Sequence, residues 1–281
     1  MPMLLADIGG TNTRCATMLP GQDPARVRRY RPRDFAGLPA LLAAYLDECT
    51  DEQRPDSAAL AVAGPVQGSQ VQMLNIDWAF DSATLCDALS LSKVSLINDF
   101  AALAHALPIL GADDLAAAGG GPAQPLGNRV VLGPGTGLGV AGLVHGHSAW
   151  HAVCGEGGHV TLAASDARET ELIAETTRRY GHCSAERLIS GPGLALIHEF
   201  LHGESVTDAA ELGARVAGGD QRARASLELQ FELLGSVAGD LALTFGAFGG
   251  VYIGGGIVPR YLDLFLKSGF RRRFEAKGRY T

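Results

Sequence analysis

Two polar residues interrupt an apolar stretch between residues 94 and 103, where the sequence reads VSLINDFAAL. Asn98 and Asp99 stand side by side, and the apolar pattern returns at Phe100. Amide and carboxylate groups are costly to bury without partners, although turns and helix caps also use this pair. We interpret the segment as a strand that ends here and leads into a helix. A carboxylate in that position is held firmly, so Asp99 is a candidate general base, with a helix cap as the alternative.

Three glycine-rich turns could bind the phosphates and base of a nucleotide. The segments are DIGGTNTR at 7–14, GPGTGLG at 133–139 and GGGI at 254–257. Glycine lets the backbone approach a ligand closely, and consecutive N–H groups can form an anion-binding concavity. None of the three is a Walker loop or a G-x-G-x-x-G dinucleotide fingerprint. Each alone could be a tight hairpin, but three of them at the ends of predicted strands favour a nucleotide site.

A second group of polar residues suits a neutral polyhydroxyl ligand. Glu156 and His159 belong to the glycine loop GEGGH, and Glu186 stands near the start of a predicted helix, where capping is the alternative role. With Asn98 and Asp99 they supply carboxylates, an amide and an imidazole, which can bond hydroxyl groups as acceptors and donors. A phosphate donor beside a polyol acceptor is the composition of a sugar kinase.

Composition and charge narrow the class of protein. The 281 residues carry a net charge of −7, which argues against a general nucleic-acid binder. No apolar run reaches the roughly 18 residues of a membrane span, and the start MPMLLADIGG lacks a secretory pattern. The cysteine number is odd, without a C-x-x-C pair, so we expect a reducing cytoplasm. The histidines and cysteines of HAVCGEGGH and GHCS match no standard zinc spacing, so structural thiols are favoured over a metal site.

The order of predicted elements indicates a mixed α/β protein. Strands are expected at 3–8, 15–20 and 93–99, with a glycine-interrupted hairpin over 129–144. A further strand is expected within 57–66, where Gly64-Pro65 closes it, and another runs from residue 250 into the triple-glycine turn at 254–256. Helices are expected at 37–50, 81–90, 100–107, 167–181 and 225–248. The segment 116–128 is the clearest loop, and a domain boundary is expected around residues 108–112. The run of arginines at 271–273 is interpreted as a solvated helix face.

Six ordered motifs resemble one known family. DIGGTNTR, INDFAAL, GPGTGLG, GEGGH, ERLISGPGL and FGGVYIGGGIVPR are similar to the proteobacterial-type glucokinases of the hexokinase/actin-like superfamily, from residue 4 to about residue 278. The resemblance implies a two-domain actin-like ATPase (ribonuclease H-like) α/β fold with the active site in the interdomain cleft. A small domain (1–110) would carry the first phosphate loop and the catalytic Asp, and a large domain (111–281) the second phosphate loop, the adenosine site and the sugar-binding Glu and His.

The resemblance also implies an activity and its residues. The reaction would be phosphorylation of D-glucose to glucose 6-phosphate by ATP and Mg²⁺ in a cytoplasmic homodimer, with Asp99 as general base. Mg²⁺ would arrive with ATP, and Asp7 could reach it through a water. The implied sugar contacts are Asn75, Asn98, Asp99, Glu156, His159 and Glu186. The implied nucleotide contacts are Ala6, Asp7, Ile8, Gly9, Gly10, Thr11, Asn12, Gly135, Thr136, Gly137, Gly254 and Gly255.

Two departures from the family pattern bear on these expectations. Leu74 precedes Asn75 where the family usually has a threonine, and loss of that hydroxyl could loosen sugar selectivity. Family members usually continue past KGRY with another strand and a final helix, whereas this chain ends at Thr281.

The alternatives are a kinase for another hexose or amino sugar, a polyphosphate-using kinase, and a non-catalytic sugar sensor of the repressor/kinase (ROK) group. No basic track for a polymer is visible, and neither a helix-turn-helix nor a cysteine-rich zinc signature is found in the sequence.

Overall fold

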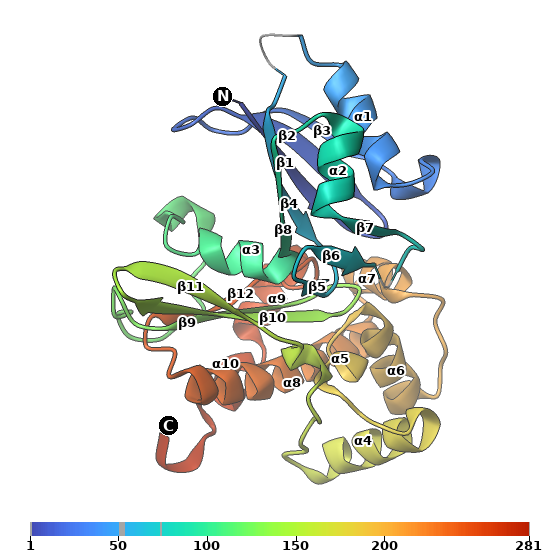
Figure 1. Cartoon of the computed structure of the whole chain (residues 1–281). Coiled ribbons are helices and arrows are strands. Elements are labelled where there is room, and N and C mark those ends of the chain that lie inside the picture. The colour runs from blue at the N-terminus through green and yellow to red at the C-terminus, as the bar shows by residue number, and fades with distance from the viewer. Residues whose placement is uncertain (1, 51–53, 74, 281) are drawn as a thin grey trace. The chain divides into compact units, whose positions relative to one another are not determined.

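The computed structural model describes residues 2–50, 54–73 and 75–280 and divides into two compact units (Figure 1). Unit 1 is Met1–Ala102 and unit 2 is Leu103–Thr281, and each has its own sheet and hydrophobic core. The helix α3 (Asp99–Ala106) contains the division between them. No helix within the described residues has both the length and the apolar character needed to cross a bilayer.

Unit 1 contains a five-stranded mixed sheet in the order β3-β2-β1-β4-β8. Its strands are β1 (Met3–Ile8), β2 (Thr13–Met18), β3 (Ala25–Tyr30), β4 (Ser57–Val62) and β8 (Lys93–Asn98). Strands β1, β4 and β8 are parallel, and their register places Ile8, Val62 and Asn98 abreast. The carboxyl ends of these three strands therefore share one edge of the sheet.

Two helices provide the apolar partner for this sheet. Leu4, Ala6 and Ile8 alternate with more exposed residues along β1, as expected for a strand with one buried face. The helices α1 (Leu38–Asp47) and α2 (Ser82–Leu89) contribute their apolar residues to the same core. The predicted helices at 37–50 and 81–90 are thereby confirmed.

A small three-stranded sheet follows β4 in unit 1. It contains β5 (Val66–Gln67), β6 (Gln70–Gln72) and β7 (Ala79–Asp81). The strand expected within 57–66 is β4, which ends at Val62, just before the Gly64-Pro65 pair that was expected to close it. Gly64 has a φ of +158° and Pro65 has no N–H to continue a ladder, so the chain turns at this point.

Unit 2 contains a four-stranded mixed sheet in the order β11-β10-β9-β12. The strands are β9 (Arg129–Pro134), β10 (Leu138–Gly146), β11 (Ala149–Cys154) and β12 (Gly250–Ile253). The hairpin predicted over 129–144 is formed by β9 and β10. In both units three antiparallel strands come first, and a later strand joins parallel beside the first of them.

Most helices of the chain belong to unit 2. They are α4 (Ala167–Tyr180), α5 (Ala185–Leu188), α6 (Gly191–His202), α7 (Ala209–Ala217), α8 (Gln221–Phe245), α9 (Leu262–Lys267) and α10 (Phe270–Glu275). The core of unit 2 is built around α8, in which residues 233–239 are all buried. The buried amide of Gln230 on α8 donates to the carbonyl oxygens of Leu188 (2.9 Å) and Ser190 (2.8 Å), which fixes the α5–α6 connection.

The arginine run at 271–273 is only partly a solvated face. These residues form part of α10, and Arg272 is exposed, but the side chain of Arg273 is 5% exposed. Its guanidinium donates to both carboxylate oxygens of Glu169 on α4, at 2.7 and 3.0 Å, and to Ser236 on α8. The sequence interpretation was wrong for Arg273, because its carboxylate partner lies 104 positions earlier in the chain.

Candidate active site

The first glycine turn joins β1 to β2 in unit 1. Gly9 N–H donates to the carbonyl of Asn12 at 3.0 Å and closes the turn, while Thr11 and Asn12 are exposed. A Cβ on Gly10 would lie 2.8 Å from the Cβ of Asn75, so glycine is needed for these segments to approach. The turn and Asn75 are thus neighbours, while Leu74 lies outside the described residues.

The strand leading into this turn presents one charged side chain. Asp7 is exposed, and Arg14 lies opposite it on β2 with 3.8 Å between guanidinium and carboxylate. An exposed pair of this kind adds little stability, which leaves the Asp7 carboxylate available to a ligand. Ala6 and Ile8 are buried in the core, so they could contact a nucleotide only through their backbone.

Asn98 and Asp99 mark the passage from β8 into α3. Asn98 Oδ1 accepts from the N–H groups of Phe100 (3.0 Å) and Ala101 (3.1 Å), which caps the helix. Its Nδ2 donates to Gly64 O at 3.2 Å and to Asp99 Oδ1 at 3.0 Å. Asn98 therefore supplies the cap and also orients the carboxylate of its neighbour.

The carboxylate of Asp99 has one oxygen held and the other open. Oδ1 accepts from Asn98 and from Phe100 N–H, whereas no other residue of the described chain donates to Oδ2. Burial raises the pKa of Asp99, and the negative charge of Asp7 also raises it, while the bond from Phe100 N–H opposes the rise. A carboxylate with a raised pKa is a stronger proton acceptor than an ordinary aspartate.

The second glycine turn has the equivalent place in unit 2, between the first two strands of its sheet. Gly135, Thr136 and Gly137 join β9 to β10, and Gly135 N–H donates to Gly137 O at 2.8 Å. No atom lies within 4 Å of where a Gly135 Cβ would be, so the turn has open space beside it. We call the segment from Gly135 to Leu138 the phosphate turn, after the ligand that the sequence leads us to expect there.

The third glycine cluster packs directly against the start of the phosphate turn. The N–H groups of Gly256 (3.1 Å) and Ile257 (3.2 Å) both donate to Pro134 O. Gly255 has a φ of +79°, and a Cβ there would overlap the backbone of Pro134. Gly254 continues the pairing of β12 by donating to Leu132 O at 2.8 Å. Two motifs about 120 residues apart in the sequence therefore meet.

The GEGGH loop packs onto β10, just after the phosphate turn. A Cβ on Gly158 would overlap Leu138 O, and one on Gly157 would lie 2.9 Å from the Cβ of Val140. The glycines thus permit the loop to lie against the strand. Glu156 and His159 are left exposed at its surface.

Glu186 connects these pieces instead of capping its own helix. Ser184 caps α5 by accepting from Arg187 N–H at 3.3 Å. Glu186 Oε2 accepts from Leu138 N–H at 2.8 Å, and Oε1 lies 3.8 Å from His159 Nε2. The candidate sugar residues Glu186 and His159 are therefore neighbours, and one of them touches the phosphate turn.

The structure brings the expected residues together in two groups, one in each unit. In unit 1 the first glycine turn, Asn75, Asn98 and Asp99 belong to segments at or next to the carboxyl edge of the sheet. In unit 2 the third glycine cluster bonds Pro134 at the start of the phosphate turn, and Glu186, which lies beside His159, bonds Leu138 at its end. Glu156 shares the loop of His159, but its side chain has no hydrogen bond or ion pair within the described part of the chain.

A pocket of about 410 Å³ in unit 2 was missed by the sequence analysis. Arg260 and Tyr261, shortly after the third glycine cluster, form one wall of it. The other wall is α7, with Ala210, Gly213, Ala214, Val216 and Ala217. The sequence could have indicated this pocket through the helical spacing of small residues in α7. Small side chains on one face of a helix leave room for a bulky group to pack there.

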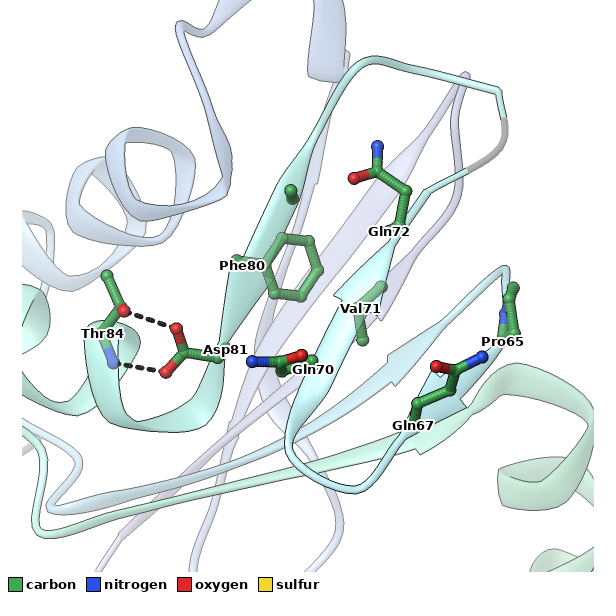
Figure 2. A pocket seen from close by; sticks show the side chains of 9 residues that line it. Pro65, Gln67, Gln70, Val71, Gln72, Phe80, Asp81 and Thr84 are labelled. Carbon is green, nitrogen blue, oxygen red and sulfur yellow. Dashed lines mark hydrogen bonds between the residues drawn. The ribbon is translucent and has the colours of Figure 1, made fainter.

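A second pocket, of about 450 Å³, lies on the small sheet of unit 1 (Figure 2). It is lined mainly by amide and apolar side chains, from Pro65, Gln67, Gln70, Val71, Gln72, Ala79, Phe80, Asp81 and Thr84. Asp81 is already engaged, since it accepts two hydrogen bonds from Thr84 at 2.7 and 2.9 Å. None of the residues predicted from the sequence lines this pocket.

The histidines and cysteines around GEGGH do not converge. His151 Nε2 bonds Gly146 O at 3.2 Å, and His182 Nε2 bonds the Thr161 hydroxyl at 2.9 Å. Within residues 2–50, 54–73 and 75–280 there is no group of three or more His, Cys, Asp or Glu that could hold a metal ion.

Comparison with known proteins places this arrangement in a family. The sequence model of the family described as Glucokinase matches residues 4–281. The chain is 47% identical over 288 residues to a glucokinase from Aromatoleum aromaticum, and the match covers 100% of this chain and 87% of that protein.

Solved structures agree with this assignment. A crystal structure of glucokinase from an Antarctic psychrotroph matches with a TM-score of 0.86 and 36% identity, covering 99% of this chain and 89% of that one. A ROK family glucokinase from Streptomyces griseus, solved with glucose and AMPPNP, has a TM-score of 0.64 at 19% identity over 98% and 90% of the chains, which shows a shared fold. The α/β chain with mixed sheets described here belongs to the glucokinase family.

Proposed function

We propose that the chain transfers the γ-phosphoryl group of ATP in line to the 6-hydroxyl of D-glucose, with Asp99 as general base. The observation that carries the proposal is the state of Asp99. Its carboxylate is fixed through one oxygen, is open at the other and has a raised pKa because of burial. Phosphoryl transfer asks the protein to align the acceptor, neutralise the phosphates and accept one proton. Asp99 can accept this proton, because one of its carboxylate oxygens is open.

The remaining sugar contacts are proposed from both units. Asn75 lies against the first glycine turn, and Asn98 orients Asp99. Glu156, His159 and Glu186 offer acceptors and an imidazole from unit 2. Hydroxyl groups of a sugar can donate to the carboxylates and accept from the amide and imidazole N–H groups.

The two glycine turns are proposed to bind the phosphates of ATP. Each joins the first two strands of a sheet, and each has an exposed threonine, Thr11 in the first turn and Thr136 in the second. The adenosine is proposed to lie near Gly254 and Gly255 and in the pocket between α7 and Arg260-Tyr261. The glycines leave room for a flat base, and the small residues of α7 offer an apolar wall.

The residues present fit a magnesium ion carried by the nucleotide. Mg²⁺ prefers oxygen ligands and is usually held by one or two carboxylates together with phosphate oxygens and waters. Asp7 is an exposed carboxylate two residues before Gly9. Its negative charge contributes to the raised pKa of Asp99. The ion would neutralise phosphate charge, and Asp7 would orient it through a water.

The wider arrangement is proposed from the family resemblance. Unit 1 would be the small domain and unit 2 the large domain of an actin-like fold, with the active site in a cleft between them. The donor and acceptor groups occur on both units, which supports an arrangement of this kind. The enzyme is also proposed to be a cytoplasmic homodimer.

The test is a coupled assay of the purified protein with glucose, mannose, fructose and glucosamine, using ATP or polyphosphate as donor. We expect the highest kcat/KM for glucose with ATP. Turnover with polyphosphate, together with no turnover with ATP, would contradict ATP as the donor. Absence of turnover with every sugar, while sugar binding persists in calorimetry, would indicate a non-catalytic sensor instead.

A second candidate is a kinase of broader hexose specificity. It is favoured by Leu74, which stands where the family usually has a threonine hydroxyl before Asn75. Comparable kcat/KM values for glucose and mannose or glucosamine in the same assay would support it. Return of selectivity in a Leu74→Thr variant would assign the effect to this position.

A further inference from the structure

The carboxylate of Glu186 touches two functional segments of unit 2 at once. Oε2 accepts from Leu138 N–H at 2.8 Å, at the end of the phosphate turn. Oε1 lies 3.8 Å from His159 Nε2, on the GEGGH loop. The Glu186 side chain is only 32% exposed, so both contacts are partly shielded from water. One side chain therefore joins the proposed sugar contacts to the proposed phosphate site.

The phosphate turn is shaped to receive this carboxylate. A Cβ on Gly137 would overlap Glu186 Oε2 and lie 3.1 Å from its carboxyl carbon. A side chain at Gly137 would therefore displace Glu186 from the Leu138 N–H. The absence of a Cβ at Gly137 therefore allows the Glu186 carboxylate to come close enough to accept from Leu138 N–H.

The backbone of Glu186 is itself firmly anchored. Ala185 N–H donates to Val160 O at 2.9 Å, which ties α5 to the segment after GEGGH. The buried amide of Gln230 donates to Leu188 O at 2.9 Å at the other end of α5. A side chain on so short and well-fixed a helix can hold a neighbouring loop in one position.

We propose that Glu186 is a positioning residue that holds the phosphate turn in its nucleotide-binding shape and couples that turn to the sugar contacts. The proposal rests on the proposed function for the identity of the two ligands. A loop that is already in its binding shape pays no ordering cost when the anion arrives. Without this anchor, the turn has its nucleotide-binding shape for only a fraction of the time. Nucleotide affinity is then reduced to that fraction of its full value. A residue that only touched sugar would leave nucleotide affinity unchanged.

The test measures binding of AMPPNP with Mg²⁺ by calorimetry in the absence of sugar. We expect Glu186→Ala to weaken binding about tenfold, the size of effect that loss of one charge-assisted hydrogen bond gives. Glu186→Gln keeps an oxygen that can accept from Leu138 N–H, so its affinity should stay within about threefold of wild type. Glu156→Ala is the matched control, because it removes the other proposed sugar carboxylate without touching the phosphate turn, and it should not change nucleotide affinity.

Either of two results with these variants would overturn the proposal. One is wild-type nucleotide affinity in Glu186→Ala, and the other is equal weakening in Glu186→Ala and Glu156→Ala. If Glu186→Ala does not fold, Gly137→Ala applies the same test from the opposite side, because its methyl group displaces the carboxylate. Wild-type affinity in that variant would also overturn the proposal. Glucose turnover by the wild-type protein is measured separately, so failure of the proposed function is distinguishable from failure of this inference.

Discussion

Asn98 and Asp99 are adjacent, so the sequence alone did not show which of them caps the helix and which could act as a base. Asn98 caps α3, because its Oδ1 accepts from Ala101 N–H, which Asp99 does not reach. Asp99 keeps one carboxylate oxygen without a donor from another residue of the described chain. The cap and the carboxylate therefore belong to different residues, and each can be removed separately by mutation.

Asp99→Asn removes the proposed base while keeping the shape of the side chain. We expect kcat to fall by at least about a hundredfold, in the range typical for loss of a general base. Burial raises the pKa of Asp99, so the ionised form is disfavoured by folding and loss of the charge should not lower Tm. Steady-state kinetics and thermal melting check both expectations, with AMPPNP binding as the control for an intact nucleotide site. Turnover near the wild-type rate would contradict the assignment of Asp99.

The pH dependence of kcat/KM tests the role of Asp99 independently. Asp99 must be ionised to accept a proton, so kcat/KM should rise with pH through the pKa of Asp99. Because burial raises that pKa, the rising limb should lie above the range of an ordinary aspartate. The limb should be absent in Asp99→Asn, and its persistence there would assign it to another group.

Gly135→Val tests the phosphate turn. A Cβ there meets no atom within 4 Å, so the fold should tolerate valine, while the added methyl groups occupy the space proposed for phosphate. We expect ATP affinity to fall at least about tenfold with little change in glucose affinity, measured by calorimetry. Gly146→Val is the matched control, since Gly146 ends the same strand β10 and its Cβ position is also empty. Equal loss of both ligands in Gly135→Val would count against the assignment.

At the scale of single residues, the sequence indicated candidate side chains but not the contacts that they make. Glu186 could be singled out by type, but its bond to Leu138 N–H joins positions 48 residues apart and leaves no local pattern. Gln230 gives no signal either, because a glutamine in a long helix is usually exposed and here it is buried. Ala6 and Ile8 were expected to contact nucleotide, and their side chains belong to the core.

Among the elements, α10 shows how a charged helix can be part of a core. Arg273 lies between α4 and α8 and bonds Glu169 through two hydrogen bonds, while Arg272 is exposed and meets Glu232 at 2.8 Å. Removal of one partner leaves a buried charge uncompensated. We expect Arg273→Ala to lower the free energy of unfolding by about 3–5 kcal/mol.

Arg272→Ala is the matched control for that experiment. Arg272 is exposed, and Glu232 keeps Arg168 as a partner at 3.3 Å, so loss of Arg272 should cost less than about 1 kcal/mol. Both variants are compared by urea denaturation. Similar costs for the two arginines would show that the Arg273–Glu169 pair does not anchor α10.

Element prediction succeeded where periodicity was strong and failed where other rules prevailed. The strand at 3–8 and the helices at 167–181 and 225–248 carry long, consistent patterns, and the structure confirms them. Strand β3, ARVRRY, was missed because three of its six residues are arginines. Helix α6 was missed because it begins within the glycine-rich segment SGPG, where Ser190 is the cap.

For the whole molecule, the distribution of proposed contacts over two units predicts a response to ligand. Asp99 and the first glycine turn belong to unit 1, whereas the phosphate turn and Glu186 belong to unit 2. If both units contact one sugar molecule, glucose should draw them together and exclude water from the reacting phosphate. Small-angle scattering should then show a smaller radius of gyration with saturating glucose than without it. An unchanged radius would argue against closure.

The central claim is that the chain transfers phosphate from ATP to the 6-hydroxyl of glucose. The most direct measurement is ³¹P NMR of the purified protein with Mg²⁺-ATP and glucose, beside a matched reaction with 6-deoxyglucose. We expect ADP and glucose 6-phosphate to form together in the first reaction. The second should yield neither a phosphorylated sugar nor ADP above the sugar-free rate, because the acceptor oxygen is missing. A phosphorylated product from 6-deoxyglucose, or no phosphorylated sugar from glucose, would contradict the claim.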